Sequence, residues 1–583
     1  MSRSKVRRCD VRFVCGLNWV EGVGLVPGAV RPGRSSAAQQ WRAAACGTVF
    51  ALCATLFTAG STALAQNGPA QPQTSRPKSI SDLLQPQAEA PARRAPSPVN
   101  ADPVGALIAE PPAEKPPPPS FEARSRPSID LSAVNLRPSD EAVILKTLDD
   151  SASHGLHRAL FAPTDLADRL KDSDPQVHAI AARELKIAIL RYARAQHGQR
   201  LAPESFLKEW GVRPEPWNPD KSFAAAVSED RLAAWIDDLA PPSPAYQALR
   251  KALATYRDLA AHGGWKLIPP GPKMTVGDHG VRVLALRARL ATEDPQLAPA
   301  PKPDLFDTDL AAAVIRYQLR TGLNPTGLVD RVTLTQLNAT VGERIAQIIA
   351  NLERWRWIDR DMPATRIEVN IAAEGMTVYG DNHPVLSMRA APGRPTDQTP
   401  MLMSKVESIV VNPPWNVPSS IAQKELWPKE AKHPGYLAAH GFHTLPDGQG
   451  GVRLQQEAGP SALGKLKFDF PNNFGVYLHD TPAHSTFAND SRAVSHGCVR
   501  LQHPQDLAKL LLKPNPNWTP ESLDEQIASG DTKRVKLQTP IPVVILYWTA
   551  YVAGGQVSFR TDIYGWDEAL LNLLSAQKAP ATT

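Results

Sequence analysis

The strongest candidate for chemistry in this chain is a cysteine late in the sequence. Cys498 is preceded by His496 and Gly497, and a second histidine, His479, ends the strand-like run 476–478. A thiol attacks a carbonyl carbon as a thiolate, so it needs a base or a cation beside it. The glycine would let the backbone expose the sulfur, and the amides of Gly497 and Cys498 would form an oxyanion hole. The pattern favours nucleophilic catalysis by Cys498, with His479 or His496 as its partner, over an inert buried cysteine.

Two histidines and a cysteine also fit a second interpretation, a zinc site. Such a site needs a further ligand, for which His484 is a candidate, but neither a Cys-x-x-Cys nor a His-Glu-x-x-His spacing occurs. We therefore expect no metal and no cofactor at these residues.

The distribution of cysteines indicates the compartment. Four of the five cysteines precede residue 65, where an apolar run after Arg42 ends in Ala63-Leu64-Ala65. This pattern is typical of a signal peptide cleaved after Ala65, and the most apolar part, 49–57, is too short for the alternative of a membrane anchor. We expect 1–65 to be a signal peptide that exports the protein. Cys498 would then be the only cysteine left, and a lone thiol in an exported protein indicates a reactive group.

Composition argues against some other classes of function and fold. The 583 residues carry a net charge of +6, which gives little support to nucleic-acid binding, and the 56 prolines are too many for compact folds alone. Many of them lie in 66–130, which we interpret as a disordered Pro-rich linker.

Three patterned regions follow the linker and must position the candidate site. Apolar residues at helical spacing predict a helical scaffold over 138–268 and a smaller helical unit over 272–340. From Arg366 apolar residues alternate with polar ones, as they do again around Val543 and Ile545, which predicts a β-rich domain over 364–575. The expected class is α+β: a helical scaffold and a small helical module, then a β-rich domain.

The small helical unit resembles the peptidoglycan-binding domain 1 family. The resemblance is carried by Val314, Tyr317-Gln318, Gly322-Leu323, Gly327, Thr333 and Leu337-Asn338. It implies that the unit binds peptidoglycan, although such modules can also serve only as helical scaffolds.

The β-rich domain resembles the L,D-transpeptidase catalytic (YkuD-type) domain. The family shows a histidine, a gap and then Ser/Thr-His-Gly-Cys, and here His479 is followed by 480–494 and Ser495-His496-Gly497-Cys498. Arg500 and the segment from Gly393 to Thr399-Pro400 also match. The resemblance extends to the large, YcbB-like members over nearly everything after the linker, which implies a lid inserted at about 412–470 and a location in the periplasm.

The resemblance implies roles for these residues. Cys498 would be the nucleophile and His479 the base, with Asp480 or a backbone carbonyl orienting His479. Ser495, His496 and Arg500 would support the site, and Tyr477 and Trp415 would contact substrate, although core packing is an alternative for the aromatic pair. Some large members have serine where this chain has His496.

The implied reaction is acyl transfer from a peptidoglycan tetrapeptide stem through a thioester to a neighbouring stem, which gives a 3→3 crosslink and needs no nucleotide. Peptidoglycan stem peptides and other wall synthases are the expected partners, and a carbapenem is expected to acylate Cys498. The alternatives are release of the thioester to water, transfer to another acceptor, or a wall-binding scaffold without catalysis.

Overall fold

A computed structural model describes residues 124, 126–358, 360–448 and 451–577 of the protein. These residues belong to one compact unit, Glu110–Thr583. The predicted signal peptide, 1–65, and the linker as far as residue 123 lie outside the described residues. None of the described helices is long and apolar enough to cross a membrane.

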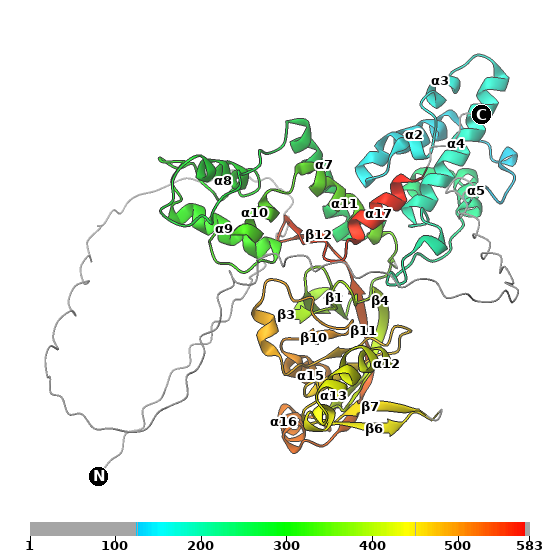
Figure 1. The fold of residues 1–583 in the computed structure, drawn as a ribbon. Helices are drawn as coiled ribbons and strands as arrows, with labels where there is room; N and C mark the ends of the chain where they lie inside the picture. Colours follow the sequence, from blue (N-terminus) through cyan, green and yellow to red (C-terminus); the bar gives the residue numbers. More distant parts are fainter. Residues whose placement is uncertain (1–123, 125, 359, 449–450, 578–583) are drawn as a thin grey trace, which may run out of the picture. The chain divides into compact units, whose positions relative to one another are not determined.

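The first described region is helical and has its own apolar core around Ile144, Leu185 and Ile189. Several of its helices begin with proline at the first turn, and α4 and α7 are capped by the side chains of Asp174 and Ser243, which fixes their starts. Its elements are η2 (Leu131–Ala133), α2 (Pro138–Asp149), η3 (Asp150–His154), η4 (Arg158–Leu160), α3 (Leu166–Arg169), α4 (Pro175–Gln196), η5 (Pro203–Ser205), α5 (Asp220–Ser228), α6 (Leu232–Asp237) and α7 (Pro244–Ala261) (Figure 1).

The small module consists of α8 (Val281–Ala291), α9 (Thr308–Thr321) and α10 (Arg331–Leu337). Gln318, buried on α9, donates to Thr326, Leu328 and Thr333 and accepts from the amide of Gly327. This one side chain therefore holds the loop after α9 and the start of α10. The spacing of Gln, Gly and Thr seen in the sequence thus has a structural cause.

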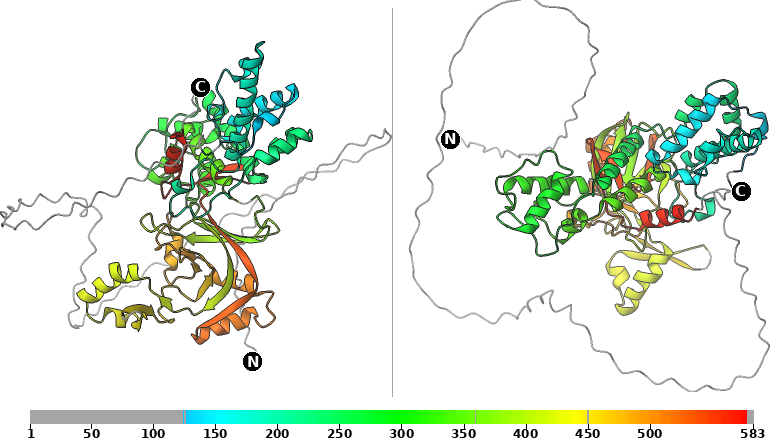
Figure 2. Two further views of the ribbon diagram at one scale, coloured as in Figure 1. Left: turned by 90° about the vertical axis from the view of Figure 1, so that its right-hand side faces the viewer. Right: turned by 90° about the horizontal axis from the view of Figure 1, so that it is seen from above.

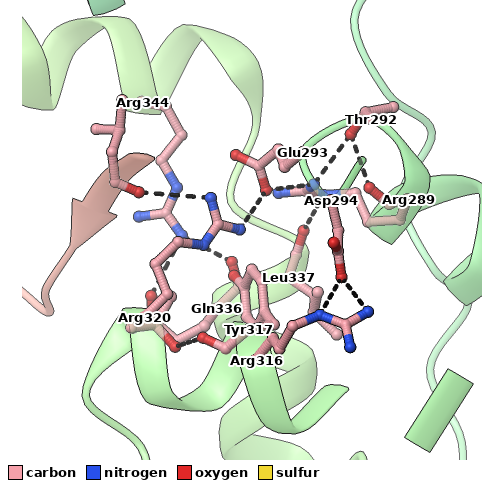
Figure 3. Close-up of polar contacts among 12 residues, drawn as sticks. Arg289, Thr292, Glu293, Asp294, Arg316, Tyr317, Arg320, Gln336, Leu337 and Arg344 are labelled. Carbon is pink, nitrogen blue, oxygen red and sulfur yellow. Dashed lines mark hydrogen bonds and ion pairs between the residues drawn. The ribbon is translucent and has the colours of Figure 1, made fainter. Parts of the chain in front are cut away.

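A buried ion-pair cluster joins this module to its neighbours. Glu293 pairs with Arg289 at 2.7 Å and with Arg320 at 3.2 Å (Figure 3). Tyr256 of α7 also donates a hydrogen bond to Glu293. Burial alone would raise the pKa of Glu293, but the two arginines and Tyr256 lower it to about 2. Arg344 of α11 (Val341–Trp355) donates to the Gln336 carbonyl at 2.8 Å and so adds a second tie.

A closed barrel forms the centre of the β-rich region. Its strand order is β1-β11-β4-β8-β9-β10-β3-β2. The strands are β1 (Arg366–Asn370), β2 (Gly375–Gly380), β3 (His383–Ala391), β4 (Leu402–Val411), β8 (Leu466–Asp469), β9 (Leu478–His479), β10 (Val499–Leu501) and β11 (Lys533–Leu546). Alternate side chains such as Phe468, Leu478 and Val499 are fully buried in the main core, so their sequence neighbours point to the outer face.

Further elements surround the barrel. They are η7 (His484–Ala488), α15 (Pro504–Leu512), α16 (Pro520–Ser529), β12 (Ala550–Ala553), β13 (Gln556–Phe559) and α17 (Trp566–Ser575). Strands β12 and β13 form a separate two-stranded sheet. Helices followed by a β-rich domain confirm the predicted α+β class.

The lid has a small core of its own, made of Val417, Ala422, Leu426, Leu437 and Leu454. It contains β5 (Trp415–Asn416), α12 (Ser419–Ile421), the π-helical turn η6 (Ala422–Leu426), α13 (Trp427–Lys432), α14 (Tyr436–Ala439), β6 (Phe442–Pro446) and β7 (Val452–Gln456). These elements form a distinct yellow lobe in Figure 2.

One predicted boundary of the lid is wrong. The expected insertion, about 412–470, includes 466–469, but these residues form β8, which pairs with β4 and β9 inside the barrel. Leu466 and Phe468 alternate with polar residues, which is typical of a strand, but the predicted lid boundary follows from the family resemblance and not from this pattern. The lid therefore ends before β8.

Candidate active site

The loop before Cys498 is held in a conformation that requires glycine. Gly497 has a φ of +113°, which side chains rarely adopt. The Ser495 hydroxyl accepts from the Gly497 amide at 3.1 Å and donates to the Cys498 carbonyl at 2.5 Å. Ser495, expected as a supporting residue, therefore ties the residues on both sides of the Cys498 side chain to one turn.

A second loop buttresses the first one. Thr399 donates to the Gly497 carbonyl at 2.8 Å and accepts from the Gly393 amide at 2.8 Å. Tyr564 donates to the Gly393 carbonyl at 2.5 Å and accepts from the Thr399 amide at 3.2 Å. The Gly-to-Thr-Pro segment is thus a brace for the cysteine loop. Sequence reasoning missed Tyr564, because a lone aromatic residue far along the chain carries no motif.

Strand register brings four of the predicted residues onto one face. In the parallel pair β9–β10, Leu478 lies opposite Val499 and His479 opposite Arg500. Leu478 and Val499 point into the barrel, so their sequence neighbours lie on its outer face. This face therefore carries Tyr477, His479, Cys498 and Arg500, with Cys498 beside Tyr477. The thiol is free and half-buried, and so is neither fully enclosed nor fully exposed.

Tyr477 is the immediate neighbour of the thiol. Burial raises the pKa of Cys498, whereas hydrogen bonds from the Tyr477 backbone and hydroxyl, together with the charges of Lys467 and Arg500, act in the opposite direction. Burial raises the pKa of Tyr477 as well, so its hydroxyl keeps its proton and can donate to sulfur. Tyr477 was expected to contact substrate, but its clearest contact is with the Cys498 thiol.

His479 is buried and uncharged. Burial lowers its pKa to about 3, and Arg500 and Lys467 add to this effect, while backbone groups of Asp480 and Leu463 oppose it. Nδ1 has no hydrogen-bond partner among the described residues, so no hydrogen bond joins it to Cys498 in this state. A neutral imidazole with one free nitrogen can accept a proton, as a general base must.

The Asp480 carboxylate is occupied elsewhere. It accepts from the amides of Lys465 and Thr481, both at 2.7 Å. Of the two orienting groups that the sequence left open, the structure therefore favours the backbone of Asp480, together with that of Leu463, over the Asp480 carboxylate.

His496 points to the lid rather than to the thiol. Its Nε2 donates to Glu425 of η6 at 2.7 Å, and Arg394 donates to the same carboxylate oxygen at 3.1 Å. The hydrogen bond from His496 lowers the pKa of Glu425, and Arg394 adds to this. His496 thus connects the cysteine loop to the lid.

Trp415 and Lys467 complete the surroundings of Tyr477. Trp415, in the first strand of the lid, donates a hydrogen bond to the Tyr477 hydroxyl. Lys467 of β8 lies opposite His479, and its Nζ is 4.1 Å from the centre of the Tyr477 ring. Sequence reasoning missed Lys467 because the predicted lid boundary assigned it to the insertion.

In this structure one of the two amides predicted to form the oxyanion hole already has a partner. The Gly497 amide donates to Ser495, so it must exchange this partner in order to bind an oxyanion. The role of the Gly497 and Cys498 amides stays a prediction. Among the described residues, no group of three or more His, Cys, Asp or Glu side chains could hold a metal ion, and His484 instead lies 3.9 Å from Asp480.

Three family models match the chain. The L,D-transpeptidase catalytic domain (YkuD) matches residues 364–543, the Scaffold domain matches 139–253, and the family described as "Putative peptidoglycan binding domain" matches 279–337.

A curated relative from Haemophilus influenzae (strain Rd), named "Putative L,D-transpeptidase", is 35% identical over 221 residues, which cover 35% of this chain and 45% of the relative. The match thus spans less than half the length of that relative.

Solved structures give weaker likenesses. An L,D-transpeptidase from Mycobacterium smegmatis is 17% identical over 31% of this chain and 58% of its own, with a TM-score of 0.18. The Enterococcus faecium catalytic domain, solved as acylated by ertapenem, is 15% identical over 32% of this chain and 98% of its own, with a TM-score of 0.16.

The matched families agree with the barrel, the cysteine loop and the helical module described above. The chain therefore contains an L,D-transpeptidase catalytic domain of the YkuD type together with a peptidoglycan-binding domain.

Proposed function

We propose that this protein is a periplasmic L,D-transpeptidase that forms 3→3 crosslinks in peptidoglycan through a thioester on Cys498. One observation carries the proposal: a free, half-buried thiol lies beside the Tyr477 hydroxyl, on the same barrel face as the neutral His479. The location rests on the signal-peptide pattern of residues 43–65.

In the first half of the reaction, Cys498 attacks the carbonyl that joins the third residue of a tetrapeptide stem to its terminal D-alanine. His479 takes the thiol proton during the attack, because both groups are neutral at rest. The hydroxyl of Tyr477 stabilises the sulfur as its charge develops. The C–N bond breaks, D-alanine leaves with the proton, and the stem remains as a thioester.

In the second half, an amine from the third residue of a neighbouring stem attacks the thioester carbonyl. His479 accepts the amine proton and returns it to sulfur as the C–S bond breaks. The thioester conserves the energy of the amide, so the reaction needs no nucleotide.

Product analysis tests this proposal. Purified protein incubated with disaccharide-tetrapeptide should give, by mass spectrometry, a crosslinked dimer that has lost one D-alanine. Disaccharide-tripeptide as the sole product would instead identify a carboxypeptidase, and unchanged substrate would favour a scaffold without catalysis.

The same chemistry predicts an inhibitor class. A carbapenem carries a strained β-lactam ring, and attack of the thiol on its carbonyl breaks the ring C–N bond and leaves a thioester. Intact-mass analysis should therefore show one covalent adduct in wild-type protein and none in Cys498→Ser. An adduct that persists in Cys498→Ser would contradict the assignment.

A further inference from the structure

Lys467 lies beside both groups of the proposed proton transfer. In the antiparallel pair β8–β9 it is directly opposite His479, and in the parallel pair β9–β10 His479 is opposite Arg500. Facing side chains on neighbouring strands start about 5 Å apart. Two cations therefore flank the imidazole in one row across three strands, on the same barrel face as Cys498.

The ammonium of Lys467 also meets the ring that touches the thiol. Its Nζ lies 4.1 Å from the centre of the Tyr477 ring. The hydroxyl of this ring hydrogen-bonds to the Cys498 thiol. A cation over an aromatic ring is attracted to it, because the face of the ring carries partial negative charge. Lys467 therefore holds Tyr477 in the place from which its hydroxyl reaches sulfur.

A carboxylate in turn holds Lys467. Its Nζ lies 2.7 Å from Oδ1 of Asp469, and Arg534 of β11 pairs with Oδ2 of Asp469 at 2.7 Å. Ser408 of β4, opposite Asp469, accepts a hydrogen bond from Arg534 and carries no charge. One anion against two cations leaves a net positive charge here. Because the side chain of Lys467 is only 22% exposed, solvent screens its charge incompletely.

This positive charge acts on both reacting groups. Burial raises the pKa of the Cys498 thiol, and Lys467 acts against burial, as the hydrogen bonds from Tyr477 do. Burial lowers the pKa of His479, and Arg500 and Lys467 lower it further. Lys467 thus favours the thiolate and disfavours the imidazolium. The proton that His479 takes from sulfur is therefore passed on more easily to the nitrogen that leaves as the C–N bond breaks.

We propose that Lys467 is a positioning residue for the thiol: its ammonium holds the Tyr477 ring against Cys498 and supplies positive charge that stabilises the sulfur anion during attack. The inference rests on the proposed function and adds a residue that lies outside the cysteine motif. Lys467 acts on the reaction through its neighbours, so its removal should change the ionisation of the thiol and not the binding of the donor.

Alkylation by iodoacetamide, followed by peptide mapping at Cys498, tests the inference in the full-length protein without any peptidoglycan substrate. Because the thiolate is the reacting form, the rate against pH reports how easily the thiol ionises. Lys467→Met should slow alkylation at pH 7 about tenfold and move the midpoint of the profile to higher pH. Lys467→Arg keeps the charge and should stay within about threefold of wild type. Lys509→Met on α15 is the matched control, because Lys509 also pairs with an aspartate, Asp524, at 2.9 Å.

A second variant changes the charge from an exposed position. The side chain of Arg534 is 60% exposed, so Arg534→Met should fold normally, and it leaves Asp469 to neutralise Lys467 alone. Alkylation at pH 7 should then slow about two- to threefold, with the midpoint again at higher pH.

A Lys467→Met profile that matches wild type would overturn the inference. So would one that is slower by the same factor at every pH, which is the result of a merely structural role, or a Lys467→Arg profile no different from that of Lys467→Met. If Lys467→Met does not fold, Arg534→Met decides, and an unchanged profile in that variant overturns the inference.

Turnover of disaccharide-tetrapeptide adds a second readout. Lys467→Met should lower kcat for D-alanine release about tenfold and leave KM within about twofold of wild type. A higher KM with an unchanged kcat would make Lys467 a substrate-binding residue and overturn the inference. Failure of wild-type protein to release D-alanine would contradict the proposed function instead, and the alkylation profiles would still decide on Lys467.

Discussion

The barrel face and the lid are built in different ways. The cysteine loop is fixed by hydrogen bonds within the barrel domain, from Ser495, Thr399 and Tyr564, and its neighbours lie on paired strands. The lid has its own small core and meets the site through a few polar contacts, among them Glu425 with His496 and Arg394. The difference indicates that the barrel fixes the position of the thiol, whereas the lid reaches the cysteine loop only through side chains, so we expect the lid to affect substrate binding more than the reaction of the thiol.

Replacing the nucleophile should have the largest effect. Cys498→Ser lowers crosslinking by more than about a thousandfold, because a serine hydroxyl is a far weaker nucleophile beside a base of such low pKa. Dimer formation from disaccharide-tetrapeptide measures this. Activity close to that of wild type would show that the barrel face is not the reacting centre.

Removing the base should have the next largest effect. His479→Asn lowers the acylation rate about 100-fold or more, both for the stem peptide and for a small carbapenem, because proton transfer from sulfur is lost. Stopped-flow acylation measures both rates, and His383→Asn, at an exposed position on β3, is the control. A loss confined to the stem peptide would assign His479 to substrate binding instead.

Weakening the Thr399 contacts to the cysteine loop should have a smaller effect, which should be similar on acylation by the stem peptide and by a carbapenem. Thr399→Val keeps the shape of the side chain but leaves the buried Gly393 amide unpaired, so we expect about 1–3 kcal/mol lower stability and about tenfold slower acylation. Urea unfolding and carbapenem acylation measure these effects. Thr396→Val, on the exposed part of the same loop, should leave both unchanged. A normal rate in Thr399→Val would show that the cysteine loop does not need this brace.

The low pKa of His479 gives a prediction for acid stability. Its folded pKa of about 3 lies below the unperturbed value of 6.5, so between these values the unfolded state binds the extra proton and stability falls as the pH is lowered. The slope from this one group is at most about 1.4 kcal/mol per pH unit. His154 and His197 also have lowered pKa values. The difference in unfolding free energy between wild type and His479→Asn from pH 7 to pH 4 isolates His479, and equal slopes would contradict its assignment as a neutral base.

The lid contact should have the smallest effect and should depend on the donor. Glu425→Gln removes the charge that His496 and Arg394 share, so we expect the KM for the tetrapeptide donor to rise about two- to fivefold, with carbapenem acylation unchanged. Glu457→Gln, an exposed lid carboxylate, is the matched control. Equal changes for the tetrapeptide and the carbapenem would show that the lid affects the reaction of the thiol itself, and would contradict the difference drawn between the lid and the barrel.

The parts of the site that belong to a sequence motif could be predicted, and the parts that depend on strand register could not. Ser495 to Cys498 and the distant His479 are given by a gapped motif, and the helical and β-rich regions follow from periodicity. Lys467 reaches Tyr477 only because β8 pairs with β9. The link from His496 to Glu425 likewise depends on how the inserted lid folds, which no local pattern encodes.

Trapping the acylated protein tests the central claim most directly. Wild-type protein mixed with disaccharide-tetrapeptide without added acceptor and quenched in acid should gain the mass of the donor less one D-alanine, and peptide mapping should place that mass on Cys498. Unmodified protein after D-alanine release, or the added mass on any other residue, would contradict a thioester mechanism at this cysteine.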